Sequence, residues 1–70
     1  MLDWDDLRIF YQTAQHGSLN RAARLLDIDQ SKVLRKIEQL EAEIGQRVLE
    51  WEPHGVSLTA AGKRLLKRIE

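Results

Sequence analysis

The chain has 70 residues, 43% of them hydrophobic, with one proline and no cysteine, which excludes disulfide-stabilised mini-proteins, thiolate metal sites, collagen-like repeats and disordered tails. Because a chain of this length hides only about 60% of its unfolded surface on folding, it has room for one modest core and none for a deep substrate cavity, so we expect no enzyme. Its 11 basic and 11 acidic residues balance, so its overall charge does not by itself indicate a nucleic-acid partner.

The neutral total conceals a segregated charge pattern. The net charge is −2 over residues 1–17, zero over 18–44, −1 over 45–58 and +3 over 59–70. Apolar runs are only a few residues long, and none follows a basic N-terminus, which excludes a membrane span and a secretory signal. We therefore expect a cytoplasmic protein with no membrane partner.

The first predicted helix covers residues 3–16. Leu7, Phe10 and Ala14 recur at spacings of three and four, as the buried stripe of an amphipathic helix does. Three aspartates lie near its start, where the helix dipole favours carboxylates, and Gly17 is placed to end it. The pattern predicts an amphipathic helix with one apolar face.

Two further helices are predicted on either side of a short polar turn. Ser18 can cap a short helix that ends near Leu26, and Asp29 can cap a longer one. In the longer helix apolar residues recur every three or four positions until Gly45. A short helix, a tight turn and a longer helix with a polar, partly basic first turn form the pattern typical of a helix-turn-helix unit.

Residues 48–58 predict a β-hairpin, or wing, because short apolar segments lie on either side of the Pro53-His54-Gly55 turn. Thr59 can cap a final helix, in which the apolar side chains share one face and basic side chains lie elsewhere. Since the helical pattern still holds at Glu70, we expect the sequence to be a fragment of a longer chain.

Several residues follow one another in a characteristic order: Asp6-Leu7, Phe10, Gly17-Ser18-Leu19, Ala22-Ala23, Leu26, Gln30, Arg35, Ile37, Leu40-Glu41, Gly45, Arg47 and Leu58-Thr59-x-x-Gly62. This order, which spans nearly the whole chain, resembles the N-terminal domain of LysR-type bacterial transcription regulators. The resemblance implies a mainly α winged helix-turn-helix with a three-helix core and a short β-hairpin wing over residues 1–58. Residues 59–70 would begin a linker and dimerisation helix. A sensor domain absent from this chain would bind any small-molecule inducer.

The resemblance further implies that the helix beginning near Gln30 enters the major groove of double-stranded DNA, where side chains distinguish base-pair edges. Gln30 can form paired hydrogen bonds with adenine, and Arg35 can bridge two guanine acceptors. Lys32 can reach a phosphate or a guanine, and Leu34, which we expect on the exposed face, can meet a thymine methyl. The expected DNA contacts are Ser18, Arg21, Gln30, Ser31, Lys32, Leu34, Arg35, Lys36 and His54.

The resemblance also implies a homodimer formed through the last helix. The side chains expected to pair the two copies are Ala61, Leu65, Leu66 and Ile69. Because Trp51 and Glu52 stand where the wing of such regulators is often basic, we expect the isolated domain to bind DNA weakly, with marked salt dependence, and to need dimerisation for stable binding.

Each expected contact has a structural alternative. Ser18 is a helix cap first and a phosphate contact second, and His54 fits an inert loop position equally well. Trp51 and an exposed Leu34 leave open a winged-helix module that binds a protein partner instead of DNA. The histidines have no ligand partner nearby, and the chain has no catalytic triad or glycine-rich phosphate loop, so we expect no cofactor, no metal and no catalytic residues.

Overall fold

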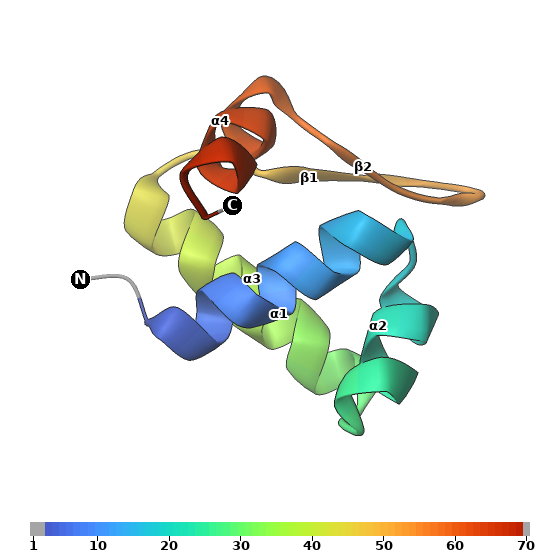
Figure 1. Ribbon diagram of the computed structural model, residues 1–70. Coiled ribbons are helices and arrows are strands. Elements are labelled where there is room, and N and C mark those ends of the chain that lie inside the picture. The colour runs from blue at the N-terminus through green and yellow to red at the C-terminus, as the bar shows by residue number, and fades with distance from the viewer. Residues whose placement is uncertain (1–2, 70) are drawn as a thin grey trace.

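The computed structural model describes residues 3–69 and contains a bundle of helices crossed by a two-stranded antiparallel hairpin (Figure 1). The elements in chain order are α1 (Trp4–His16), α2 (Leu19–Leu26), α3 (Gln30–Ile44), β1 (Leu49–Glu52), β2 (Gly55–Leu58) and α4 (Ala60–Ile69). The predicted mainly α winged helix-turn-helix is confirmed. Glu70, at which the sequence pattern is still helical, lies outside the described residues.

The helix boundaries follow from local capping. Gly17 ends α1 in the left-handed conformation, with φ of 61°, which glycine adopts without the steric penalty of a Cβ atom. Ser18 caps α2 as predicted, because its Oγ accepts a hydrogen bond of 3.2 Å from the Arg21 N–H. Asp29 occupies the predicted N-cap position of α3, but its side chain makes no capping bond to the described residues.

The core lies where α1 and α3 cross. Phe10 of α1 and the stripe of Val33, Ile37 and Leu40 on α3 are fully buried against one another. Burying such side chains contributes about 1.5–3 kcal/mol each relative to leaving them exposed. The small, buried Ala22 and Ala23 let α2 pack closely against both α1 and α3. The three helices therefore enclose a single core.

A charged pair is partly buried at the edge of this core. The Asp6 side chain on α1 is buried, and its Oδ1 lies 3.5 Å from Nζ of Lys36 on α3, whose side chain is 25% exposed. That Asp6 oxygen makes no hydrogen bond with the described residues. Lys36 is therefore the nearby charge that compensates the Asp6 carboxylate.

The start of β1 is joined to α3 and α4 by hydrogen bonds. The Val48 N–H donates to Oε2 of Glu41 on α3 at 2.9 Å, and the Val48 carbonyl accepts from the Thr59 N–H at 3.1 Å. Thr59 caps α4 as predicted, since its Oγ1 accepts from the Gly62 N–H at 3.0 Å and donates to the Arg47 carbonyl at 2.6 Å. These bonds set the direction in which α4 leaves the hairpin.

The hairpin lies across the end of α1 (Figure 1). Its register pairs Leu49 with Leu58 at the base and Glu52 with Gly55 at the turn. The Val56 N–H donates to the Gly17 carbonyl at 2.9 Å, which fixes the outer half of the hairpin beside the turn between α1 and α2. The wing is thus tied to the start of α2.

We expect Gly62→Ala to destabilise the domain by about 1–3 kcal/mol, because a Cβ atom there would overlap the Val48 carbonyl oxygen. Helix propensity alone predicts the opposite, a gain of about 1 kcal/mol. Urea unfolding followed by circular dichroism measures the difference. Lys63→Ala, at the next and exposed position, is the matched control, and a Gly62→Ala variant at least as stable as wild type would contradict the close approach.

We expect Lys36→Met to lower the free energy of unfolding by about 1–3 kcal/mol, the cost of an unsatisfied buried polar group, because it leaves the buried Asp6 carboxylate without its partly exposed cation. Lys32→Met, one turn earlier and exposed, serves as control and should change stability by less than about 0.5 kcal/mol. Adding Asp6→Asn to Lys36→Met should restore part of the loss. Equal unfolding free energies for the two lysine variants would show that the pair has no structural role.

Candidate nucleic-acid interface

The exposed face of α3 carries most of the side chains predicted to meet DNA. Gln30, Ser31, Lys32 and Arg35 are exposed on the first two turns. The buried stripe of the same helix holds one side of α3 against α1, and these four side chains lie around the remaining sides of its first two turns. All four side chains are accessible, and their contacts with DNA stay a prediction.

Gln30 has a partner that the sequence did not indicate. Its Nε2 donates a hydrogen bond of 3.0 Å to Oδ1 of Asn20, which lies on the first turn of α2. With Arg24 and Asp29, these two residues line a shallow hollow between α2 and α3. An exposed asparagine early in a helix gives no sequence signal for such a contact, because its partner lies ten residues away.

Two residues of α3 differ from the expected exposed positions. Lys36 directs its ammonium at Asp6, so its charge is engaged within the domain, and its contact with DNA stays a prediction. Leu34 is half-buried, whereas the sequence placed it on the exposed face. The reason is that Leu34 adjoins the buried stripe at Val33 and Ile37, and close packing of α3 covers part of its side chain.

Acidic residues at the start of α1 influence the same region. Asp5 accepts a hydrogen bond of 2.9 Å from the Arg8 guanidinium, which, with the more distant charges of Lys36 and Lys32, holds the pKa of the Asp5 carboxyl below its ordinary value. Asp5 therefore stays ionised and contributes a negative potential at one flank of the basic face of α3.

The remaining predicted contacts lie on α2 and the wing. Arg21 is exposed, while Ser18 is half-buried and uses its hydroxyl oxygen as the cap of α2. His54 is exposed in the turn of the hairpin. The bond between Val56 and Gly17 holds the outer half of the hairpin beside the start of α2, and the contacts of these three residues with DNA stay a prediction.

The wing carries an exposed aromatic residue between two carboxylates. Trp51 is 39% exposed and is flanked on β1 by Glu50 and Glu52. The alternative of a protein-binding module predicts an apolar surface formed by Leu34 and Trp51. Because Leu34 is half-buried, α3 contributes less to such a surface than predicted.

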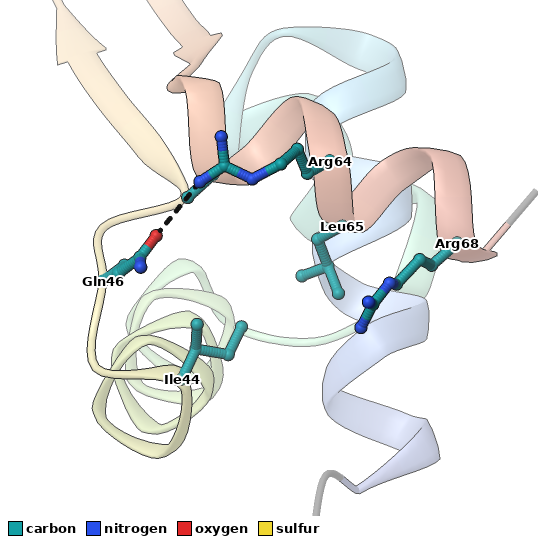
Figure 2. A pocket seen from close by; sticks show the side chains of 6 residues that line it. Ile44, Gln46, Arg64, Leu65 and Arg68 are labelled. Atoms are coloured by element: carbon teal, nitrogen blue, oxygen red, sulfur yellow. Dashed lines mark hydrogen bonds between the residues drawn. The ribbon is translucent and has the colours of Figure 1, made fainter.

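Three of the four side chains predicted to form a dimer line two separate hollows, and Leu66 lines neither. Leu65 of α4 lies opposite Ile44 across a groove that Arg64 and Arg68 also line, as Figure 2 shows, and Ala61 lines the same groove. Arg64 donates to Oε1 of Gln46 at 3.5 Å across the same groove.

The other predicted dimer residues lie further along α4. Ile69 lines a second hollow with Trp4 and Tyr11 of α1. Leu66 and Ile69 are half-buried and also pack against the core of their own chain. Their role in pairing two copies stays a prediction.

Residues 3–69 hold no group of three or more His, Cys, Asp or Glu side chains placed to bind a metal ion. Within the same residues, each helix is too short or too polar to cross a membrane.

Comparison with known proteins identifies the family. The sequence model of the family described as "Bacterial regulatory helix-turn-helix protein, lysR family" matches residues 4–63 of this chain. The chain is 43% identical over 61 residues, 87% of its length, to the uncharacterized HTH-type transcriptional regulator YusT of Bacillus subtilis (strain 168). It is 38% identical over 66 residues, 94% of its length, to the HTH-type transcriptional regulator ClcR of Pseudomonas putida. The chain spans only 21% and 22% of these relatives.

Solved structures agree with this assignment. The structure of a CbnR_DBD-DNA complex matches with a TM-score of 0.92 and 33% identity over 96% of this chain and 77% of that one. A BenM_DBD/benA site 1 DNA complex matches with a TM-score of 0.90 and 30% identity over 96% and 78% of the two chains. The chain therefore belongs to the lysR family of bacterial regulatory helix-turn-helix proteins, and its fold is that of the family's winged helix-turn-helix DNA-binding domain.

Proposed function

We propose that this chain binds double-stranded DNA with sequence preference, as the DNA-binding part of a bacterial transcription regulator, and that the first two turns of α3 enter the major groove. The observation that carries the proposal is the exposed N-terminal end of α3, where the polar side chains of Gln30, Lys32 and Arg35 are all accessible. A helix of about 10–12 Å diameter fits the major groove, which is about 12 Å wide. Similarity to two domains solved with DNA supports this mode of binding.

Base recognition is assigned to Arg35 and Gln30. The Arg35 guanidinium offers two parallel N–H groups to O6 and N7 of guanine, and Gln30 offers one donor and one acceptor to adenine. Ser31 and Leu34 lie between them on the helix, where a hydroxyl contacts either type of base edge and an apolar side chain contacts a thymine methyl.

Phosphate contacts position the domain. Lys32 and Arg21 supply exposed cations at the starts of α3 and α2, and the Ser18 hydroxyl can donate to a phosphate while its oxygen caps α2. His54 reaches the backbone from the hairpin turn. Lys36, which faces Asp6, contributes mainly by holding α3 in place.

Stable binding is proposed to require two copies joined through α4, by the residues predicted above. A two-fold dimer would place two α3 helices in successive major grooves and select an inverted-repeat site. The regulator would act on DNA in the cytoplasm, with any small-molecule inducer bound by a further domain. We propose binding and no catalysis for these residues.

We expect Arg35→Ala to weaken binding to a site selected from a random DNA library by about 5- to 150-fold, which corresponds to about 1–3 kcal/mol for a bidentate guanine contact. Fluorescence anisotropy of labelled duplex measures the dissociation constant. Arg47→Ala, which removes the same charge at an exposed position beyond the far end of α3, is the control. If the folded wild-type chain binds no DNA even at low salt, the DNA-binding proposal is wrong and a protein partner becomes the better explanation.

We expect Lys32→Ala to weaken binding to all DNA sequences alike and to reduce the slope of log affinity against log salt by about 1, because one phosphate contact is lost. The same titrations at several salt concentrations give the slope. Lys63→Ala on α4 should leave it unchanged. A Lys32→Ala variant with the wild-type slope but altered base preference would assign Lys32 to a guanine instead.

A further inference from the structure

We propose that Asn20 is a positioning residue for base recognition, which holds the Gln30 carboxamide in the orientation that reads adenine; this inference rests on the proposed function. The observation behind it is the hydrogen bond of 3.0 Å from Gln30 Nε2 to Asn20 Oδ1. Both side chains are exposed, and they come from the first turns of the two helices of the helix-turn-helix.

The hydrogen-bonding capacity of Gln30 makes this arrangement useful. A glutamine carboxamide has two N–H donors and one carbonyl oxygen with two lone pairs. The bond to Asn20 uses one N–H, so the second N–H and Oε1 remain available on the same carboxamide. These are the donor and the acceptor that pair with N7 and the N6 amino group of adenine.

The same bond couples the orientations of the two carboxamides. If the Gln30 amide alone turned over, its Oε1 would face the Asn20 Oδ1, and these two acceptors would repel each other, so the Asn20 amide would have to turn over as well. Held as it is, Gln30 presents its donor and acceptor in one order, which suits adenine and not guanine, whose O6 is an acceptor where adenine has a donor. Asn20 thereby acts on specificity without touching a base.

Preorganisation is the physical gain. A free, exposed glutamine samples many rotamers, and ordering it on binding costs conformational entropy. In the free protein the hydrogen bond to Asn20 already restricts the Gln30 side chain, at the shallow hollow between α2 and α3 that both residues line. In the complex, water is excluded from this contact, and the hydrogen bond between the two amides becomes stronger than it is in the free protein.

The test compares adenine with guanine at the base pair that Gln30 reads. A site is first selected from random duplex DNA with the wild-type chain, and the relevant base pair is the one whose preference disappears in Gln30→Ala. Fluorescence anisotropy then gives the ratio of affinities for adenine and guanine at that position. The variants are Asn20→Ala, Asn20→Asp, Gln30→Ala and the double Asn20→Ala, Gln30→Ala, with Gln39→Ala, an exposed amide further along α3, as control.

We expect Asn20→Ala to lower the adenine-to-guanine ratio at least about 3-fold and to leave the salt slope unchanged, since no charge is lost. In the Gln30→Ala background the same change should have no further effect on the ratio, because Asn20 acts through Gln30. Asn20→Asp retains the acceptor that faces Gln30, so it should keep the ratio while its negative charge weakens binding to every sequence. Urea unfolding checks that all variants are folded.

Several results would overturn the inference. An unchanged ratio in folded Asn20→Ala would make Asn20 a bystander, and an equal loss of affinity for adenine and guanine sites would make it a phosphate contact. The inference is also wrong if Gln30→Ala loses no base preference. None of these results contradicts the proposed binding to DNA. Absence of any DNA binding by the wild-type chain would overturn the proposed function together with this inference.

Discussion

The burial of one stripe of α3 against α1 is the constraint on which the rest of the domain depends. Val33, Ile37 and Leu40 have no exposed surface, and they fix the rotation of α3 about its own axis. A turn of one residue, about 100°, would expose this stripe and carry the charged Arg35 toward the core, where an unpaired guanidinium is very costly. The apolar core thus decides which polar side chains of the helix are presented to a partner.

Hydrogen bonds add to the small apolar core in positioning the hairpin and α4. The hairpin and α4 are tied to the helices through Val48, which bonds to Glu41 and Thr59, and through the bond between Val56 and Gly17. These are mostly backbone groups with few alternative partners, so each bond restricts the direction of the segment that follows. These bonds act together with apolar packing, because Val48 and Leu49 are fully buried in the core and Leu58, Leu65 and Leu66 pack against it.

The neutral net charge of the chain is compatible with a DNA-binding surface because some charges pair within the domain while other cations stay exposed. The acidic start of α1 holds Lys36 through Asp6, while Lys32 and Arg35 remain exposed on the neighbouring face. Local clustering of exposed cations, and not the total charge, determines the potential that a phosphate backbone meets. The carboxylates of β1 limit that potential at the wing.

The sequence by itself determined the helices, the hairpin and the polar face of α3, because caps and apolar periodicity act between residues within a few positions of one another. Only the tertiary structure decided that Lys36 meets Asp6, thirty positions away, and that Asn20 meets Gln30. The same packing leaves Leu34 half-buried, whereas the sequence pattern predicted it on the exposed face. Such contacts depend on how helices cross and rotate against one another, and a helical pattern read along one segment carries no information about the side chains that a neighbouring helix brings to it.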